Sequence, residues 1–378
     1  MNIGFDAKRA FHNDTGLGNY SRTLIKSLVQ YYPENEYFLF NPKPSEKYRF
    51  NSPKIHEVLP QSFFTKIFSS AWRSKLVIND LPEYNLDLYH GLSHEIPAGI
   101  NKTRIKSVVT IHDLIHERYP QQYNKIDVSI YHKKFLYACK NADRIIAVSE
   151  QTKNDIKEFY SISDEKIDVC YQSCDPSFSI KITEDEKNKA KEKYGLPDKF
   201  FLYVGSIIER KNLLTICKAM HALQNETSVP LVVIGTGDKY INEVKRFIEK
   251  KKLENRIIFL SEKFTGNSFY TELPAIYQCA TALLYTSLFE GFGIPVLEAL
   301  WSGLPVITSN TSCMPETGGD AALYVSATDF VDVADAMLRV ISDDVLVEDM
   351  KQKGWLHAQK FTPQKCASSV MDVYKKLI

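Results

Sequence analysis

The stretch that decides the fold is FEGFGIPVLEALWSGLPVITS, residues 289–309. It follows TALLYT, residues 281–286, an apolar run of strand length, and Pro295 suits an early position of a helix after a glycine-containing loop. A strand–loop–helix unit of this kind directs unpaired backbone N–H groups, and the positive end of the helix dipole, towards a ligand above the strand. Gly291 and Gly293 have no side chains that would keep such a ligand from the backbone. The stretch therefore predicts a phosphate-binding loop at the carboxyl end of a buried strand.

Two glutamates, Glu290 and Glu298, stand eight positions apart around this predicted helix start. In the first turn or so of the helix, Glu298 could accept hydrogen bonds from a pair of vicinal hydroxyls. Taken singly, each glutamate has a simpler interpretation: Glu298 complements the helix N-terminus, and Glu290 is a solvated loop residue. The pattern as a whole resembles the E-x7-E signature of retaining glycosyltransferases of family 4.

Members of that family have the α/β GT-B fold, in which two Rossmann-like, doubly wound parallel-sheet domains face one another and a C-terminal helix returns to the first. The resemblance implies that Glu290 contacts hydroxyls of the donor sugar and that Glu298 contacts the nucleotide ribose. It also implies that the sugar and the diphosphate contact the backbone around Gly291, Phe292, Gly293 and Ile294.

The composition is that of an ordinary globular protein, with 378 residues, 44% hydrophobic and 25% charged. This length favours two domains, and a formal net charge of +1 argues against a dedicated nucleic-acid binder. Seven scattered cysteines favour reduced thiols over a disulfide framework or a zinc site. We find neither a signal-peptide core nor the roughly 18 apolar residues of a membrane span. We therefore expect a cytoplasmic protein, with peripheral binding at the inner face of the membrane left open.

Short apolar strand candidates alternate with helical stretches, which is typical of parallel sheets covered on both faces. They are residues 3–6, 37–40, 86–90, 107–111, 144–148 and 167–171 in the first half, and 200–204, 231–234, 257–260, 282–286 and 306–308 in the second. Between the halves the chain turns polar, and Thr183 followed by Glu186 has the spacing of a helix capping box. We predict an acceptor-side domain at residues 1–175, a nucleotide-sugar donor domain at 176–361, and a helix at 362–378 that packs back on the first domain.

Gly16 and Gly18 open a predicted helix, but a lone G-x-G is weak evidence for a dinucleotide site. The glycines lag Asp6, at the end of the first predicted strand, by ten positions, and Ser21 stands where a third glycine would be needed. These departures weaken an oxidoreductase interpretation. The resemblance implies instead that this loop approaches the donor diphosphate, and a plain flexible loop is the alternative.

The predicted strand SVVTI is followed by His112 and Asp113. A histidine at a strand's carboxyl end can exchange hydrogen bonds with a sugar hydroxyl near neutral pH, although an isolated histidine is more often structural. The resemblance implies that His112 lies beside the donor sugar and the acceptor, with Asp113 orienting it or touching the acceptor. The stretch HGLSHEIP, residues 90–97, resembles the family's acceptor-side loop. Its candidate residues are Ser93, His94 and Glu95.

In the second half, the predicted strand FLYVG ends at Gly205 and is followed by Ser206 and then by Arg210 and Lys211. Arginine offers a bidentate fork and lysine a point charge, so two adjacent cations above a strand suit an anionic leaving group. Exposed surface cations are the alternative. The resemblance implies that this pair binds the diphosphate, although many members have an arginine where this chain has Ser206. LVVIGTGDK, which contains Gly235, resembles the loop under the nucleotide base.

One stretch fits the predicted active site less well, namely PQSFFTKIFSSAWRSKL, residues 60–76. Its apolar residues recur at helical spacing with lysine and arginine among them. A buried amphipathic helix is the default interpretation. The alternative is a docking surface for an anionic membrane or a lipid-linked acceptor.

The resemblance implies a retaining hexosyltransferase, and analogy suggests polysaccharide biosynthesis as its setting. The segments HGLSHEIP and VTIHDL are most similar to mannosyltransferase-type members of the family. The enzyme would therefore move a hexose, first choice mannose from GDP-mannose and then a UDP-linked sugar, to a hydroxyl of a glycan or lipid-linked acceptor. The predicted catalytic residues are Glu290, His112, Lys211 and Arg210. We expect no metal and no other cofactor, because no D-x-D motif stands at a strand end and the two cations could neutralise the departing diphosphate. The alternatives are a GT-B sugar-nucleotide epimerase and a non-catalytic sugar-nucleotide-binding protein.

Overall fold

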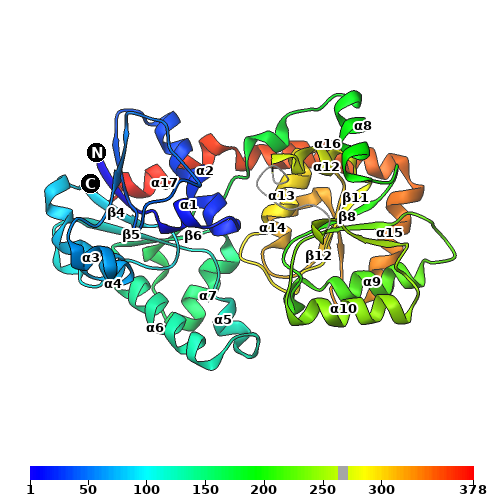
Figure 1. The fold of residues 1–378 in the computed structure, drawn as a ribbon, viewed down its shortest axis with the longest axis horizontal. Coiled ribbons are helices and arrows are strands. Elements are labelled where there is room, and N and C mark those ends of the chain that lie inside the picture. Colours follow the sequence, from blue (N-terminus) through cyan, green and yellow to red (C-terminus); the bar gives the residue numbers. More distant parts are fainter. Residues whose placement is uncertain (263–270) are drawn as a thin grey trace. The chain divides into compact units, whose positions relative to one another are not determined.

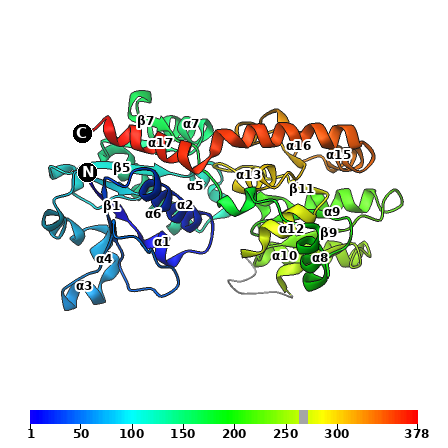
Figure 2. The same cartoon turned by 90° about the horizontal axis from the view of Figure 1, so that it is seen from above.

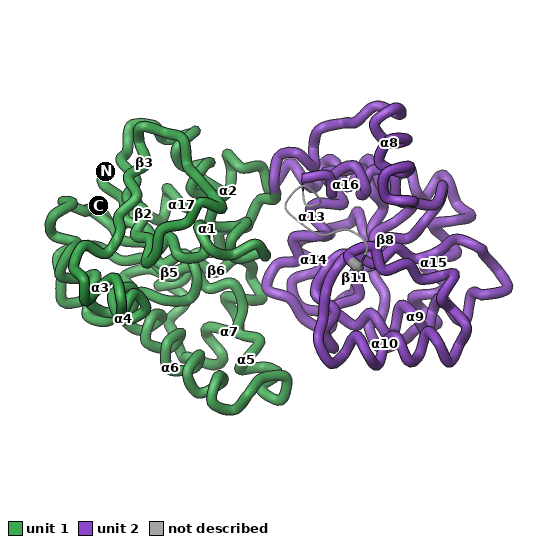
Figure 3. Tube along the Cα trace, viewed as in Figure 1, with its two compact units in different colours: residues 1–174, 361–378 green, residues 175–360 purple. Residues whose placement is uncertain are grey.

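The computed structural model describes residues 1–262 and 271–378. The chain divides into two compact units, which Figure 3 colours separately: Met1–Cys174 with Phe361–Ile378, and Asp175–Lys360. Each unit is built on one sheet, and every described strand pair is parallel (Figure 1). Parallel strands need crossover connections, and helices supply most of them here.

The first unit has a seven-stranded sheet in the order β3-β2-β1-β4-β5-β6-β7. Its strands are β1 (Asn2–Asp6), β2 (Glu36–Phe40), β3 (Ile55–Val58), β4 (Leu88–Gly91), β5 (Lys106–Ile111), β6 (Arg144–Ala147) and β7 (Ile167–Val169). Its helices are α1 (Lys8–His12), α2 (Gly16–Tyr31), α3 (Phe63–Ile67), α4 (Ser69–Ser74), α5 (Ile115–Arg118), α6 (Lys125–Asn141), α7 (Glu150–Tyr160) and α17 (Pro363–Lys375).

The C-terminal helix α17 belongs to the first unit, where it packs beside α2 (Figure 2). Val370 and Met371 are buried in the same apolar core as Leu24 and Leu28 of α2. The hydroxyl of Tyr374 lies 2.6 Å from Nδ1 of His90, at the end of β4. Both apolar packing and a buried hydrogen bond therefore hold the chain's last helix against the first sheet.

The second unit has a six-stranded sheet in the order β10-β9-β8-β11-β12-β13. Its strands are β8 (Phe201–Val204), β9 (Leu231–Ile234), β10 (Ile257–Phe259), β11 (Ala282–Tyr285), β12 (Val306–Ser309) and β13 (Ala322–Val325). Its helices are α8 (Glu184–Tyr194), α9 (Leu213–Ala222), α10 (Lys239–Lys250), α12 (Leu273–Cys279), α13 (Ile294–Trp301), α14 (Met314–Gly318), α15 (Phe330–Ser342) and α16 (Asp344–Ala358). The predicted capping box is present, because the Thr183 side chain accepts from the Glu186 N–H and the Glu186 side chain accepts from the Thr183 N–H.

The predicted amphipathic helix at residues 60–76 is wrong as a single buried element. The chain there forms two short helices, α3 and α4, and α3 buries none of its residues. Phe63 is 81% exposed and Phe64 59%, whereas Trp72 of α4 is fully buried and its indole N–H donates to Asp80 at 2.6 Å. α4 is thus anchored to the unit, while α3 presents aromatic side chains to solvent.

All seven cysteines are buried free thiols, so none forms a disulfide. Among residues 1–262 and 271–378, we find no helix with the length and apolar character needed to cross a membrane.

Candidate active site

The side chains of two loops converge on one carboxylate at the carboxyl edge of the second sheet. Oε1 of Glu290, in the loop after β11, lies 2.8 Å from Nη1 of Arg210 and 3.0 Å from Nζ of Lys211, both in the loop after β8. The same oxygen accepts hydrogen bonds of 3.0 Å from the hydroxyls of Tyr285 and Ser287. Within the described chain, Oε2 of Glu290 takes no such partner. One oxygen therefore orders the cluster, and the other makes no such contact with the described residues.

This cluster is buried, and its charges stabilise one another. Burial alone would raise the pKa of Glu290, but the charges of Lys211 and Arg210 outweigh it and lower the pKa to about 2. Burial also lowers the pKa of Lys211, against the opposing effect of Glu290. At neutral pH Glu290 is a carboxylate and not an acid, so it can accept hydrogen bonds and support positive charge but has no proton to give.

Tight backbone contacts hold the loop after β8 in place. Gly205 has a φ of 150°, and the Lys211 side chain lies over it, because a Cβ built on Gly205 would come within 3.1 Å of the lysine Cδ. A Cβ on Gly235, after β9, would meet the Gly205 carbonyl oxygen at 1.8 Å. Asn212 adopts the left-handed conformation and donates to the carbonyls of Thr286 and Ala327 at 3.1 and 2.5 Å. These contacts tie the cationic loop to the loop that carries Glu290.

The loop after β11 is fixed by α14 and the turn before it. The Ser312 hydroxyl accepts from the Glu290 N–H at 3.1 Å, and the Cys313 thiol donates to the Glu290 carbonyl at 3.1 Å. The Thr317 hydroxyl donates to the Phe292 carbonyl. Gly291 and Phe292 are buried and Ile294 is half-buried, so the backbone of this loop has little freedom to move.

Helix α13 begins after Gly293, as the sequence predicts, with Pro295 in its first turn. Gly293 has a φ of 89°, a backbone conformation that favours glycine, and a Cβ there would lie 2.5 Å from Cε of Met314. Glu298 lies in the second turn of α13, and its Oε2 accepts a hydrogen bond from the Tyr277 hydroxyl at 2.8 Å. Burial raises the pKa of Glu298 to about 7, although the Tyr277 hydrogen bond opposes the shift.

The two glutamates of one motif thus differ in their protonation. Glu290 is held as an ion by two cations, whereas Glu298 changes its charge near neutral pH. Ser206, in the loop after β8, is exposed, and its carbonyl accepts from the Tyr203 hydroxyl and the Ile208 N–H, both at 3.1 Å. Sequence reasoning missed the two tyrosines that hold the glutamates, Tyr285 and Tyr277. The position of Tyr285 at the end of an apolar strand was an available signal, but nothing in the sequence relates Tyr277 to Glu298.

The first unit places its candidate histidines at the carboxyl ends of β4 and β5. His112 is buried, with Nε2 2.9 Å from the Leu92 carbonyl and Nδ1 3.4 Å from the Gln172 amide nitrogen. Its ring meets those of Tyr20 and His94 edge-on, with centroids 4.6 and 5.2 Å away. Burial and the neighbouring His94 lower the pKa of His112 to about 3. The imidazole is therefore neutral at physiological pH, and both of its nitrogens face protein groups.

The other acceptor-side candidates lie around this pair. The ring of His94 stacks on Phe135 at 4.2 Å, and its backbone has a φ of 64°. Glu95 accepts from Arg73 and Lys134 at 3.2 and 3.1 Å. Asp113 is half-exposed and accepts from the Ile115 N–H at 3.2 Å.

The two glycines at the start of α2 differ in their surroundings. A Cβ on Gly18 would meet the Asn13 carbonyl oxygen at 1.9 Å, whereas one on Gly16 would meet nothing within 4 Å. Gly18 therefore serves the packing of the loop, and only Gly16 faces open space.

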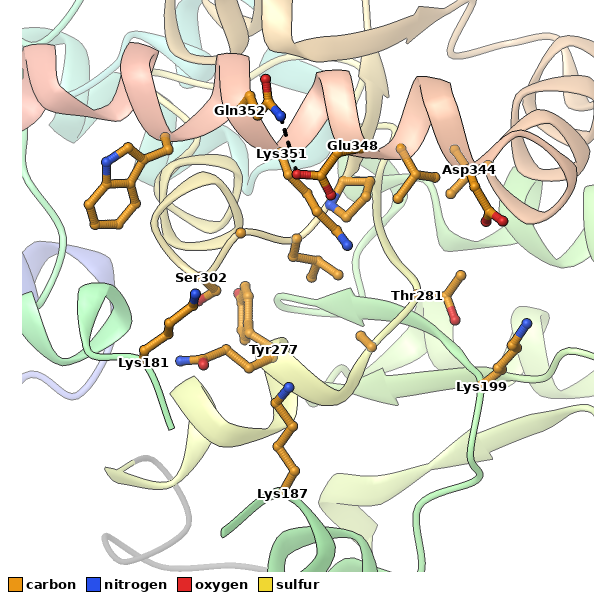
Figure 4. Close-up of a pocket in the computed structure, with 18 of the residues that line it drawn as sticks. Lys181, Lys187, Lys199, Tyr277, Thr281, Ser302, Asp344, Glu348, Lys351 and Gln352 are labelled. Atoms are coloured by element: carbon orange, nitrogen blue, oxygen red, sulfur yellow. Dashed lines mark hydrogen bonds between the residues drawn. The ribbon is translucent and has the colours of Figure 1, made fainter. Parts of the chain in front are cut away.

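A cavity of about 990 Å³ lies in the second unit (Figure 4), and part of its lining precedes β11 and β12, at the opposite ends of these strands from the loop of Glu290. Its lining includes Thr281 and Pro305, which precede β11 and β12, together with Lys351 and Gln352 of α16. Ligands of open α/β sheets bind at the carboxyl ends of the strands, so this cavity is not the candidate active site. No group of three or more potential metal ligands occurs among the described residues.

Sequence models of two families match the chain. The model described as Glycosyltransferase Family 4 matches residues 15–178, and that described as Glycosyl transferases group 1 matches residues 184–356. The chain therefore belongs to these glycosyltransferase families, and the family resemblance predicted from the E-x7-E motif is confirmed.

Curated relatives include several mannosyltransferases. O-antigen chain mannosyltransferase B of Escherichia coli is 26% identical over 394 aligned residues that cover 100% of both chains. O-antigen chain mannosyltransferase RfbU of Salmonella typhimurium is 31% identical over 62% of this chain and 60% of that protein.

Solved structures show the same fold. Sucrose-phosphate synthase from Thermosynechococcus elongatus superposes with a TM-score of 0.80 at 18% identity, covering 100% of this chain and 99% of that one. The Anabaena protein HepE, solved in complex with UDP and glucose, has a TM-score of 0.75 at 16% identity, with 99% of each chain covered. The predicted GT-B fold is thus confirmed.

Proposed function

We propose that this glycosyltransferase moves a hexose, with retention at the anomeric carbon, from a nucleoside-diphosphate sugar to a hydroxyl of a glycan or lipid-linked acceptor. The observation that carries the proposal is the buried cluster of Glu290, Arg210 and Lys211 beside the N-terminus of α13. It combines cations suited to a diphosphate with a carboxylate that stays ionised. Mannose from GDP-mannose is the favoured donor, and surface polysaccharide assembly the favoured setting, because both relatives described above are O-antigen mannosyltransferases.

The chemistry follows from the charges in the cluster. As the bond between the anomeric carbon and the leaving phosphate oxygen breaks, negative charge grows on the diphosphate and positive charge on the sugar ring. Arg210 and Lys211 stabilise the first and Glu290 the second. No other carboxylate stands out as a nucleophile of the kind that retaining glycosidases use. The acceptor oxygen therefore bonds to the anomeric carbon from the leaving-group side, and its proton passes to the departing phosphate oxygen.

The cations also make a metal unnecessary in this proposal. Two fixed positive charges and the helix N–H groups supply the stabilisation that a divalent ion gives in other transferases. Calorimetric titration with GDP, UDP and ADP in the presence of EDTA tests this point. Micromolar binding of one nucleotide would name the donor class. Binding that requires added magnesium would contradict metal independence.

Product analysis tests the reaction itself. Purified protein is incubated with the nucleotide sugar chosen by calorimetry and with a panel of acceptors, and the products are followed by mass spectrometry and by NMR of the anomeric proton. A new glycoside with the donor's anomeric configuration is expected. An inverted product would overturn retention, isomerised donor without transfer would indicate an epimerase, and an unchanged donor a binding protein.

We also propose that the exposed aromatic surface of α3 docks on the inner face of an anionic membrane. Phe63, Phe64, Ile67 and Phe68 are each more than half exposed, and the exposed Lys66 and Lys75 flank them. Apolar side chains interleaved with cations suit the boundary between headgroups and acyl chains. The nearby anchor at Trp72 would hold this surface to the first unit.

Vesicle pelleting tests the membrane proposal. The protein should sediment with phosphatidylcholine vesicles that contain phosphatidylglycerol, and much less with phosphatidylcholine alone. Phe64→Ser with Phe68→Ser should abolish pelleting without changing nucleotide affinity. Val345→Ser with Leu356→Ser, two exposed apolar positions of α16 in the second unit, is the matched control. If the wild-type protein pellets with neither type of vesicle, the membrane proposal is wrong.

A further inference from the structure

The first unit carries an unbalanced set of charges at the carboxyl ends of β1 and β4. Asp6 ends β1, Lys8 and Arg9 follow it in α1, and Arg73 of α4 and Glu95 after β4 complete the set. Burial, then the charges of Arg73 and Arg9, lower the pKa of the half-buried Lys8. The contacts of Asp6 and Glu95 bring Arg73 and Lys134 into the same set.

The two carboxylates already have partners. Arg73 donates from Nε to both oxygens of Asp6 at 3.0 and 2.8 Å, and its Nη2 lies 2.6 Å from Oδ2. Arg73 and Lys134 share Oε2 of Glu95. Within the described part of the chain, the ammonium group of Lys8 and the guanidinium of Arg9 have neither an ion pair nor a hydrogen bond. Asp6 and Glu95 therefore fix Arg73 and Lys134 and leave two cations uncompensated.

Neighbouring polar atoms are also left without partners. Nε of Arg9, Oγ of Ser93 and Nδ1 of His94 are buried and make no hydrogen bond with the residues that the structure describes. Arg73 bridges Asp6, three residues before Arg9, to Glu95, next to His94, so the start of α1 lies at the same sheet edge as the loop of Ser93 and His94. Buried polar atoms without a hydrogen-bond partner are costly unless something binds them. The carboxyl edge of a parallel sheet is where a ligand is expected.

We propose that Lys8 and Arg9, beside the loop at Ser93 and His94, bind an organic phosphate of the acceptor substrate. The inference rests on the proposed transfer reaction and narrows the acceptor to an anionic one. Phosphate is favoured over a carboxylate because Arg9 offers several donors and Lys8 adds a second charge. The phosphate could be a diphosphate that links a glycan to a lipid or a phosphate ester on a sugar, and these two sources share the same recognition chemistry.

The test uses inorganic pyrophosphate as the probe, at constant ionic strength, with the nucleotide selected by calorimetry present in excess to occupy the second unit. Line broadening of the pyrophosphate ³¹P signal reports binding. Lys8→Gln with Arg9→Gln should weaken it about tenfold or more. Lys102→Gln with Arg104→Gln removes the same charges from exposed positions of the first unit and should leave it unchanged.

Three outcomes would overturn the site. They are equal binding by the wild type and the Lys8/Arg9 variant, equal loss in both double variants, and loss of pyrophosphate binding in the wild type whenever nucleotide is bound. The last result would mean that these cations serve the donor diphosphate. Failure of nucleotide binding itself would instead contradict the proposed function, so the two failures are distinguishable.

Competition then identifies the source of the phosphate. Either a short-chain prenyl diphosphate or a hexose 6-phosphate should displace pyrophosphate from the wild type, and displacement by neither would contradict acceptor recognition. Replacing Lys8 and Arg9 removes no hydrogen bond or ion pair of their side chains, so the variant should fold. Unchanged nucleotide affinity and an unchanged unfolding midpoint check this, and each single variant is available if the double variant is unstable.

Discussion

The carboxyl edges of the two sheets differ in the charge state of their buried titratable groups. In the second unit, Glu290 is held as an ion by Arg210 and Lys211, and its pKa is lowered to about 2. In the first unit, burial lowers the pKa of His112 to about 3, and the ring is kept neutral. The carboxyl edge of the second sheet thus holds fixed charges that suit the proposed diphosphate and the positively charged sugar ring. At the carboxyl edge of the first sheet the histidines are neutral, so positive charge comes from lysine and arginine.

Glu290→Gln should have the largest effect on activity. The amide keeps the size of the side chain but removes the negative charge that supports the sugar, so turnover should fall by about 10²- to 10³-fold. Nucleotide affinity should stay within about threefold, because the nucleotide alone lacks the sugar. Steady-state kinetics and calorimetry measure the two quantities. Glu254→Gln, at an exposed position, is the control. Parallel collapse of nucleotide binding would show that Glu290 acts mainly by positioning the cations.

Acid sensitivity should come from the first unit. Burial lowers the pKa values of His90, His94 and His112 from 6.5 to about 3. Each contributes stability that is fully present above pH 6.5 and is lost as the pH falls towards 3, because the unfolded chain binds the proton first. The loss is at most about 1.4 kcal/mol per pH unit for each histidine.

The substitution His94→Phe measures how much His94 contributes to this loss of stability at acid pH. Phenylalanine keeps the stacking on Phe135, so the free energy of unfolding should depend less steeply on pH between 6.5 and 5 than in the wild type. Urea unfolding at several pH values measures the slope. The same slope in both proteins would mean that His94 is protonated in the folded state, and the contrast between the two sheet edges would be lost.

Glu298 should make nucleotide binding depend on pH. Its pKa is raised to about 7, and only the carboxylate can accept from both hydroxyls of a ribose, so affinity should rise about tenfold from pH 6 to pH 8. Tyr277→Phe removes the hydrogen bond that opposes the shift, and the midpoint should move to higher pH. Glu298→Gln is the reference, because any remaining pH dependence belongs to the nucleotide phosphate. An unmoved midpoint in Tyr277→Phe would assign the titration to another group.

The sequence predicts the central strands well because they are buried on both faces and read as continuous apolar runs, as β9 does at Leu231–Ile234. It also predicts the outer strands β7 and β10, at 167–171 and 257–260, but not the outer strands β3 and β13. β3 reads IHEV, with two exposed residues, and β13 has only Val325 fully buried. Strands that are only partly buried lack the continuous apolar run that makes a strand recognisable, so their assignment depends on the sheet that they join.

The candidate site divides in the same way. Arg210, Lys211 and Glu290 lie in loops that local patterns mark, and the structure brings them together. Their mutual pairing, in contrast, depends on how β8 and β11 neighbour each other in the sheet. The neutral state of His112 depends likewise on burial, which no local pattern encodes. Residue types and loop positions are therefore predictable from sequence, whereas charge states come from tertiary packing.

Ser206→Arg should have the smallest effect. It tests the charged edge of the second sheet by adding one more cation there. Ser206 is exposed, and its side chain has no hydrogen-bond partner within the described chain, so the substitution should leave stability within about 0.5 kcal/mol. A third cation beside Arg210 and Lys211 should strengthen nucleotide binding by only a few fold at low salt, because exposed charges are screened. Ser206→Gln controls for side-chain size. A gain that survives high salt would mean that the new guanidinium contacts the diphosphate directly, and no gain at all would mean that two buried cations already complete the clamp.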